Sequence, residues 1–192
     1  MKRMIESIEN VIQMDKGVID VLVSHCRQKE VRKKTLLISP LVKDENVYIL
    51  EKGIARSYNI IDGKEVTSWF SQEGDLTFST NSFYGKTEGY ESERVQCLED
   101  SLLNYIKISD LERLCNQYID IANWLRLLHQ KAFVEMERRL IYRLYMSAEE
   151  RYRDFYSKNP AIFQRVNLSY IASYLGISTV TLWKLRKSVL SS

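Results

Sequence analysis

The side chains whose types and spacing could carry a function lie together near the C-terminus. Ser and Thr hydroxyls can hydrogen-bond to base edges, a Val methyl suits a thymine methyl, and Lys and Arg bind phosphates. All of these types occur in one short stretch with helical spacing. The sequence therefore predicts a DNA-contacting set made of Ser178, Thr179, Val180, Thr181, Trp183, Lys184, Arg186 and Lys187.

Two short helices would position this set. Asn167 can cap the first, Gly176 can end it in the left-handed conformation, and Ser178 can cap the second. The apolar faces would be Leu168, Ile171, Ala172 and Leu175, then Val180 or Thr181 with Leu182 and Leu185. Such a pair is typical of a helix-turn-helix, whose second helix enters the DNA major groove. The alternative is a hairpin that only packs, with Lys184 to Lys187 as a solvated face.

Charge is distributed unevenly along the chain. Residues 138–192 carry ten Lys and Arg against three Asp and Glu, whereas residues 44–112 carry six against fourteen. A basic C-terminal region beside an acidic middle is the electrostatic pattern of a protein that binds nucleic acid at one end. Ordinary helix-surface charge is the alternative.

Residues for catalysis or metal binding are sparse. His25 and His129 are the only histidines, and Cys26, Cys97 and Cys115 are far apart, which predicts no metal site and favours a reducing cytoplasm. The expected strands contain no histidine, and the sequence shows no phosphate loop or nucleophile–base spacing. We therefore expect no enzyme. The chain also lacks a long apolar run and a signal-peptide pattern, so we expect a cytoplasmic protein without a membrane partner.

Short runs rich in β-branched and aromatic residues fill the middle of the chain. They follow a helical region at residues 4–28, where Gly17 suggests a break. Asp62-Gly63 between two such runs is a strong hairpin signal. Regular spacing of short strands predicts an antiparallel β-sandwich or roll. The expected strands begin near Thr35, Val47, Ile54, Glu65, Arg94 and Leu102.

A long helix is predicted over residues 118–146, with no Pro or Gly inside. At 1.5 Å per residue it would span about 40 Å, more than a small domain needs. Its apolar positions cover neighbouring faces, so one face can rest on the roll while another pairs with a second copy. A single buried helix is the alternative. Ser147 and Glu150 form a capping-box pattern that starts another helix, which would end before Pro160.

A roll, a long helix and a C-terminal helix-turn-helix, in this order, resemble the CRP/FNR family of bacterial transcription regulators. The residues that carry the resemblance are Val47-Tyr-Ile-Leu-Glu-Lys-Gly-Ile-Ala-Arg-Ser-Tyr, Phe70-Ser-Gln-Glu-Gly-Asp, Leu98-Glu-Asp-Ser-Leu-Leu, Ser147-Ala-Glu-Glu-Arg-Tyr and Tyr170-Ile-Ala-Ser-Tyr-Leu-Gly-Ile-Ser. The last two are especially similar to short members from Bacteroidetes-type bacteria. The resemblance covers nearly the whole chain. It implies a cyclic-nucleotide-binding-like roll, a homodimer and double-stranded DNA as partner.

Two departures from the family pattern affect these expectations. In the implied ligand pocket, Glu91 takes the place of the Arg that holds the phosphate of cyclic AMP, beside Ser92, and Asn81 takes the place of the ribose-binding Glu. A carboxylate repels a phosphate, so we expect another effector or none, and the cofactor stays unknown. In the second helix, Thr179 and Val180 replace the family's usual Arg or Pro and Glu, so the family's DNA preference does not carry over.

The sequence thus predicts an α+β fold with N-terminal helices, an antiparallel β-roll (a double-stranded β-helix), a long dimerisation helix and a C-terminal helix-turn-helix. The predicted domains are residues 1–117, 118–146 and 147–192. We expect a dimeric DNA-binding transcription regulator whose roll senses a small molecule other than cyclic AMP. The alternative function is a ligand-binding or protein-interaction roll with a degenerate DNA-binding tail.

Overall fold

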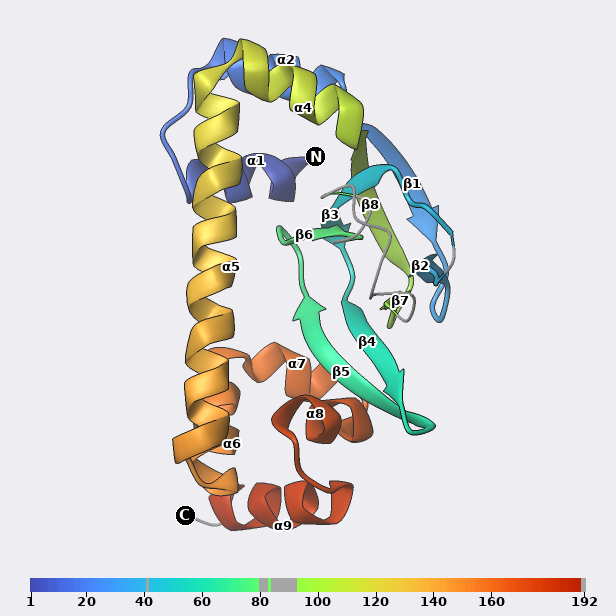
Figure 1. Cartoon of the computed structure of the whole chain (residues 1–192), viewed down its shortest axis with the longest axis vertical. Coiled ribbons are helices and arrows are strands. Elements are labelled where there is room, and N and C mark those ends of the chain that lie inside the picture. The colour runs from blue at the N-terminus through green and yellow to red at the C-terminus, as the bar shows by residue number, and fades with distance from the viewer. Residues whose placement is uncertain (41, 80–82, 84–92, 191–192) are drawn as a thin grey trace. The chain divides into compact units, whose positions relative to one another are not determined.

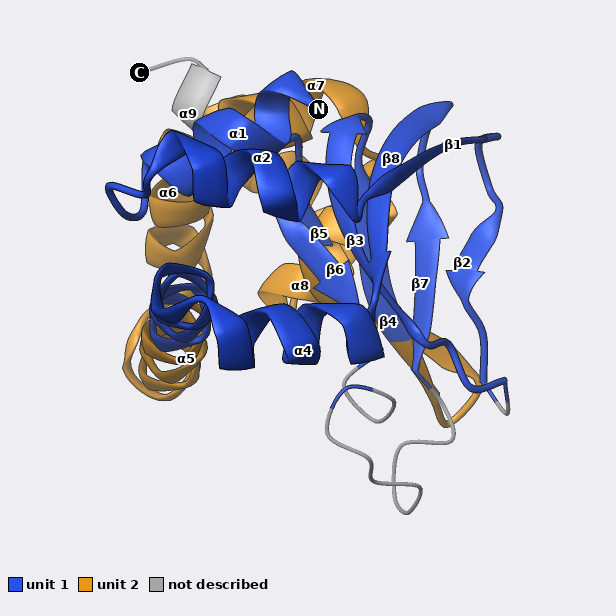
Figure 2. Cartoon of the chain, turned by 90° about the horizontal axis from the view of Figure 1, so that it is seen from above, with its two compact units in different colours: residues 1–58, 70–131 blue, residues 59–69, 132–192 orange. Residues whose placement is uncertain are grey.

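The structure, a computed structural model, describes residues 1–40, 42–79, 83 and 93–190 (Figure 1). The predicted α+β class is confirmed, with helices at both ends of the chain and two antiparallel sheets between them. The chain forms two compact units: residues 1–58 with 70–131, and residues 59–69 with 132–192 (Figure 2). The domain boundaries after residues 117 and 146 stay a prediction. Among the described residues, no helix combines the length and the apolar character that a membrane span requires.

Two short helices open the first unit, α1 (Lys2–Glu9) and α2 (Lys16–Ser24). The break between them falls at residues 10–15, so the prediction of a break at Gly17 was wrong. Asp15 is the cap of α2, and its Oδ1 accepts a 2.8 Å hydrogen bond from the Gly17 amide. Gly17 therefore lies in the first helical turn, where its amide satisfies a cap.

Within the described residues, eight strands form the roll. In the order of the chain they pair in a nested way, first with last: β1 with β8, β2 with β7, β3 with β6 and β4 with β5. This nesting is the double-stranded β-helix that the sequence predicted. The bounds are β1 (Arg27–Val31), β2 (Leu36–Ile38), β3 (Asn46–Lys52), β4 (Ala55–Ile61), β5 (Lys64–Ser71), β6 (Leu76–Phe78), β7 (Arg94–Cys97) and β8 (Ser101–Lys107). Strands β1 and β6 were not predicted.

The hairpin between β4 and β5 turns at Asp62-Gly63, as predicted. Both residues have a positive φ, 50° at Asp62 and 72° at Gly63. Positive φ at both central positions matches the right-handed twist of the flanking strands, and Gly and Asp tolerate it. The tip of this hairpin, residues 59–69, belongs to the second unit.

The core of the first unit joins its helices to one sheet. Met4 and Ile8 of α1 are fully buried and pack in one cluster with Val47 and Ile49 of β3. The same cluster includes Trp124, from the start of the long helix. Apolar residues three and four positions apart lie on one face of a helix, and in α1 this is the face that packs against the sheet.

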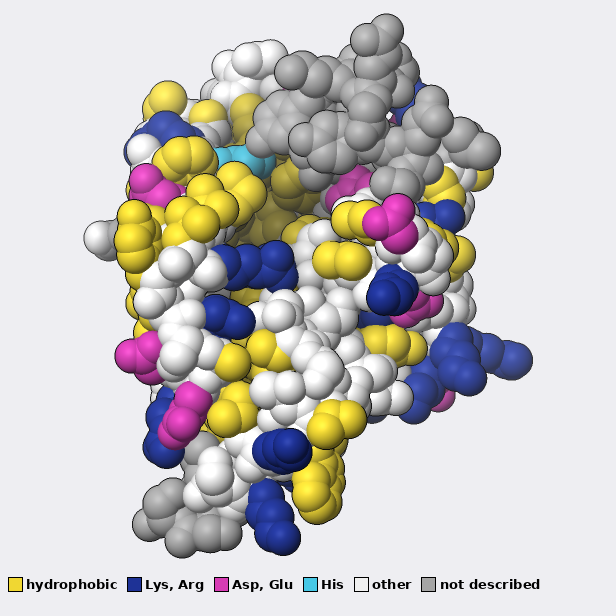
Figure 3. Space-filling view, turned by 60° about the horizontal axis from the view of Figure 1, so that its bottom comes forward, with side chains coloured by type: hydrophobic (Ala, Val, Ile, Leu, Met, Phe, Trp, Pro, Cys, Tyr) yellow, Lys and Arg dark blue, Asp and Glu magenta, His cyan; other side chains and the backbone are white. Residues whose placement is uncertain are grey.

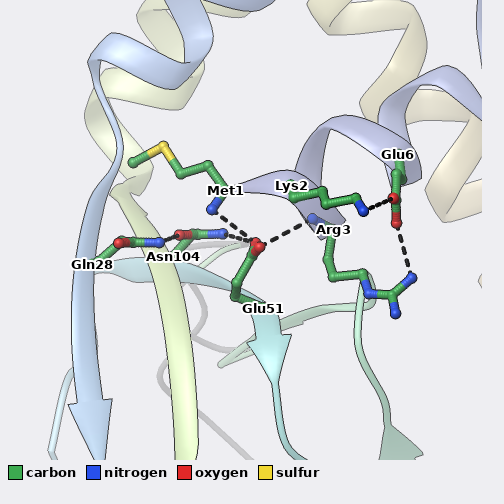
Figure 4. Close-up of polar contacts among 7 residues, drawn as sticks. All are labelled: Met1, Lys2, Arg3, Glu6, Gln28, Glu51 and Asn104. Atoms are coloured by element: carbon green, nitrogen blue, oxygen red, sulfur yellow. Dashed lines mark hydrogen bonds and ion pairs between the residues drawn. The ribbon is translucent and has the colours of Figure 1, made fainter.

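Polar contacts at Glu51 fasten α1 to the sheet (Figure 4). The carboxylate accepts from the N-terminal ammonium at 3.1 Å, from the Arg3 amide at 3.2 Å and from Asn104 Nδ2 at 2.9 Å. Gln28 Nε2 donates to Asn104 Oδ1 at 2.8 Å, which extends the network to β1. Burial opposes ionisation of Glu51, but the three donors outweigh it and lower its pKa below the ordinary value.

In the described part of the chain after the roll, residues 108–190, the helices are α4 (Ile108–Gln117), α5 (Ile119–Tyr145), α6 (Ala148–Lys158), α7 (Pro160–Arg165), α8 (Leu168–Leu175) and α9 (Thr179–Leu190). The predicted capping box of α6 is confirmed, because the Glu150 amide donates to Ser147 Oγ and the Ser147 amide donates to Glu150 Oε2. Helix α7 was not predicted. Pro160 follows Asn159, the residue at which α6 ends. It occupies the first turn of α7, where a backbone N–H would have no partner within the helix, so its absence loses no hydrogen bond.

Candidate nucleic-acid interface

Helices α8 and α9 are joined by the tight turn that the sequence predicted. Asn167 Oδ1 accepts from the Ser169 amide at 2.9 Å and so caps α8. Gly176 has a φ of 69°, and the Ile177 amide donates to the Ala172 carbonyl at 3.0 Å. These bonds satisfy backbone groups that a helix end leaves unpaired. Ile171, Leu175 and Leu182 are buried, so the two helices share an apolar core.

The start of α9 uses two predicted site residues for its own cap. Ser178 Oγ accepts from the Thr181 amide at 3.0 Å and lies 2.8 Å from Thr181 Oγ1. Thr181 is half-buried, so of the two alternatives for the packed position it is Thr181 and not Val180 that faces inward. Thr179 is exposed at the first position of the helix.

The other predicted residues lie on the outer side of α9. Val180 is 66% exposed and Trp183 is 59% exposed, whereas Leu182 between them is fully buried. Lys184, Arg186 and Lys187 are exposed as well. The Lys187 ammonium lies 5.8 Å from the centre of a Trp183 ring, within cation–π range. Basic and exposed hydrophobic side chains lie beside one another on the face shown in Figure 3.

Many of the basic side chains in residues 138–192 bind other groups of the same chain. Three arginines donate to backbone carbonyls and three other basic residues pair with carboxylates of their own helices. The first three are Arg139, Arg143 and Arg151, and the others are Arg138, Arg153 and Lys158. Sequence counting cannot tell such cations from phosphate-binding ones. The electrostatic argument for nucleic-acid binding therefore depends mainly on the basic residues of α9, and less on the net charge of residues 138–192.

Two of these arginines hold the C-terminal end of α8. Arg143 Nη2 donates to the Tyr174 carbonyl at 3.2 Å, and Arg151 Nε donates to the Leu175 carbonyl at 3.3 Å. Cations at a helix C-terminus satisfy unpaired carbonyls and interact favourably with the helix dipole. They fix the direction in which the chain leaves α8 and enters the turn to α9.

Ser173 of α8 binds the edge of strand β5 within the second unit. Its Oγ accepts from the Thr67 amide at 2.9 Å and donates to the Glu65 carbonyl at 2.9 Å. Among the described strands, β5 is the last of its sheet, so no described strand pairs with its outer backbone groups. Arg139 adds bonds to the Ser68 and Thr67 carbonyls. We call Ser173, Arg139 and the strand segment 65–68 the hairpin clamp.

The clamp was missed by sequence reasoning. The Arg139 guanidinium also lies over the Tyr174 ring, with its central carbon 4.1 Å from the ring centre, and burial lowers the pKa of Arg139 below the ordinary arginine value. A lone Ser on a helix and an Arg in a charged stretch carry no local signal, and Ser173 is 106 residues from Thr67.

The predicted ligand pocket falls on residues that are not described. Asn81, Glu91 and Ser92 lie outside the described residues, so their expected roles stay predictions. Two charged side chains among the described residues of the first unit are buried. Arg56 on β4 is 1% exposed with its guanidinium carbon 4.1 Å from the Tyr58 ring centre, and Glu93 is 8% exposed.

The cysteines and histidines are dispersed. All three cysteines are free thiols, and burial raises the pKa of Cys26 to about 11. His129 Nδ1 lies 2.8 Å from the Leu125 carbonyl, and its ring lies beside Phe78 and Phe83. Among the residues that the structure describes, no group of three or more His, Cys, Asp or Glu side chains is arranged to hold a metal ion.

Solved structures share the fold of this chain at low sequence identity. FixK2 from Bradyrhizobium japonicum superposes with a TM-score of 0.73 at 19% identity, over 86% of this chain and 85% of its own. A protein assigned to the CRP/FNR family of transcriptional regulators, from Eubacterium rectale, gives 0.69 at 14% identity, over 93% and 84%. The c-di-GMP-responsive global regulator CLP from Xanthomonas campestris gives 0.67 at 14% identity, over 92% of both chains.

No protein-family model matches the sequence, and neither does any curated protein. The evidence from relatives is thus structural, and it extends over both compact units because the superpositions cover most of the chain. The sequence motifs predicted this structural similarity to CRP/FNR regulators. The chain has the fold of the CRP/FNR family of regulators.

Proposed function

We propose that this chain is a DNA-binding transcription regulator of the CRP/FNR family. The observation that carries the proposal is the outer side of α9, where exposed Thr179, Val180 and Trp183 precede Lys184, Arg186 and Lys187. Helix α8 and the turn at Gly176 hold α9 as a helix-turn-helix holds its recognition helix. In this proposal the first residues of α9 contact bases and its cations contact phosphates.

The second part of the proposal is a homodimer formed through the C-terminal half of α5. Large apolar side chains are exposed there, including Met136 at 64%, Leu140 at 61% and Leu144 at 68%. By contrast, Ile121 and Trp124 at the start of α5 are buried in the core of the first unit. An apolar face of this extent is unusual on a monomer, and a second copy would cover it in the manner of a coiled coil.

The roll is proposed as the sensor, with an effector other than cyclic AMP. The basis is the sequence replacement of the phosphate-binding Arg by Glu91, together with the charged groups Arg56 and Glu93 buried in the roll. A regulator with this organisation acts on DNA in the cytoplasm and performs no enzymatic reaction, and we propose both for this chain.

Selection from random double-stranded DNA with the purified full chain tests the proposal. A dimer with two recognition helices should enrich a two-fold symmetric motif whose half-sites lie about one helical turn, or a multiple, apart. A matched pair of variants removes equal charge: Lys184→Gln with Lys187→Gln, and Lys16→Gln with Lys52→Gln, all exposed lysines. The first pair should abolish enrichment at moderate salt and the second should not.

A second function is favoured by one observation, the exposure of Val180 and Trp183. Such a pair could bind a protein, which would make the roll a ligand-binding or interaction module with a degenerate tail. If low-salt selection enriches no motif and both variant pairs behave alike, this second function replaces the first.

A further inference from the structure

Two large apolar side chains of α9 are mostly exposed to solvent. Val180 and Trp183, 66% and 59% exposed, are three residues apart, so they adjoin on one side of the helix. The packing of α9 is provided by Leu182, which is fully buried, with Leu185 and Thr181 half-buried. Exposed apolar surface of this kind marks a contact site when it sits among polar residues.

The charges around the pair favour a polyanion as the partner. Lys184 and Lys187 follow at the four- and seven-residue spacing from Val180, on the same side of the helix, and Arg186 is exposed nearby. Residues 176–192 contain no Asp or Glu. A protein partner with an apolar surface would not require this charge, whereas DNA phosphates would.

The hydroxyl groups at the start of α9 are largely committed to the helix. Ser178 Oγ and Thr181 Oγ1 lie 2.8 Å apart, and the Thr181 amide donates to Ser178 Oγ. Of the three hydroxyl residues in this segment, Thr179 is thus the one outside the cap network. Besides Thr179 and the cations, the outward side chains of α9 that could contact bases are then the apolar Val180 and Trp183.

The major-groove edge of DNA offers one apolar group, the 5-methyl of thymine. We infer that Val180 and Trp183 determine specificity by packing on thymine methyl groups, so that each half-site contains thymine at the positions facing them. This inference rests on the proposed DNA-binding function and deepens it by naming the chemistry that is read. A thymine methyl suits these two side chains because the contact buries apolar surface on both partners and requires no hydrogen bond from either side chain.

Uracil substitution tests the inference, because it removes the methyl group and leaves the hydrogen-bonding edge of the base unchanged. Affinity for the selected site would be measured with each thymine replaced in turn by uracil. At the contacted positions the affinity should fall about fourfold for each methyl, the equivalent of ~0.8 kcal/mol for one buried carbon. Uracil at positions outside the half-sites should have no effect.

Protein variants locate the contact on the helix. Val180→Ala and Trp183→Ala should lower the affinity for the thymine site and make it insensitive to uracil at the matching position. Val42→Ala is the control, because Val42 is 64% exposed and lies in the roll. It should retain the full uracil effect.

The outcomes separate this inference from the function beneath it. A selected motif in which every thymine tolerates uracil overturns the inference and leaves DNA binding intact. A motif whose uracil effect persists in both alanine variants also overturns it, because other residues then read the methyl. Failure to select any motif overturns the DNA-binding function and the inference with it, and assigns the apolar pair to a protein partner.

Discussion

Ser173 accepts a hydrogen bond of 2.9 Å from the backbone N–H of Thr67, 106 residues away in the sequence. Through this bond and its return bond to the Glu65 carbonyl, helix α8 completes the unpaired edge of strand β5. The first helix of the proposed DNA-binding pair is therefore fastened to the hairpin that the chain forms between β4 and β5.

Removal of the clamp hydroxyl should destabilise the second unit. Ser173→Ala leaves the Thr67 amide and the Glu65 carbonyl without this partner, and we expect a loss of about 1–3 kcal/mol in the free energy of unfolding. Denaturant titration followed by tryptophan fluorescence would measure it. Ser188→Ala is the control, since Ser188 Oγ bonds to the Leu185 carbonyl of its own exposed helix. Equal stability of the two variants would show that the Ser173 hydroxyl contributes nothing to the stability of the second unit.

Charge placed on the exposed half of α5 should produce monomers. Met136→Glu with Leu144→Glu puts two carboxylates where we propose a dimer seam, and burying unpaired charge there is costly. Both side chains are more than 60% exposed, so the fold of one copy is not expected to change. Leu128 would be a poorer choice, because it packs against the core of the first unit.

Sedimentation velocity at micromolar concentration distinguishes the states. The wild type and a Val42→Glu control, altered at a comparably exposed site, should sediment as dimers, and the double variant as a monomer. A wild-type chain that is already monomeric would contradict the proposed seam.

Acid should weaken the attachment of α1 to the sheet. The pKa of Glu51 is lowered in the folded protein, so its carboxylate stabilises the fold above the unfolded pKa, about 4.3. That contribution is lost as the pH falls through the lower folded value. Glu51→Gln should therefore be less stable than the wild type at pH 7, by ~1–2 kcal/mol, and the gap should close at low pH.

Unfolding free energies from pH 7 down to pH 3 would record this convergence. Glu9→Gln, which changes an exposed glutamate of α1, should run parallel to the wild type over the range. A constant gap for Glu51→Gln would mean that the ionised carboxylate is not the source of its effect.

Local signals explain which parts of the fold could be predicted. The caps at Asn167 and Ser147, the turn at Asp62-Gly63 and the stop at Gly176 depend on residues within four positions of one another, and each is confirmed. Strand β1 (Arg27–Val31) was missed because RQKEV has little apolar alternation, and its pairing with β8 is what makes it a strand. Strand β6 has three residues, too few for a periodic pattern.

In the candidate site too, locally determined features could be predicted and features that depend on distant contacts could not. The sequence identified the residues of α9, but it could not tell that Ser178 and Thr181 bond to each other while Val180 faces outward. Nor could it separate Arg139, which binds backbone carbonyls, from cations on the surface. Both distinctions depend on contacts with residues that are distant in the sequence or on the rotation of the helix about its axis.

Cyclic AMP and cyclic GMP should bind weakly or not at all. The resemblance places Glu91 where the phosphate-binding Arg is expected, and this replacement loses a charge-assisted bond and adds a like charge. Each effect costs more than about 1.4 kcal/mol, so affinity should be at least roughly a hundredfold below that of a site with the Arg. Calorimetry would measure it. Micromolar binding by the wild type would refute the prediction, and affinity gained by Glu91→Arg would support it.

The salt dependence of DNA affinity tests the central proposal most directly. Affinity for the selected site would be measured by fluorescence anisotropy from about 50 to 200 mM salt, for the wild type, Lys184→Gln with Lys187→Gln, and Lys16→Gln with Lys52→Gln. Each phosphate contact contributes about 0.9 to the slope of log affinity against log salt. We predict a steep slope for the wild type and the Lys16/Lys52 variant, and a slope flatter by about 0.9 per lost contact for the α9 variant. Equal slopes for all three proteins, or no binding by the wild type at the lowest salt, would contradict the assignment of α9 as a DNA-binding helix.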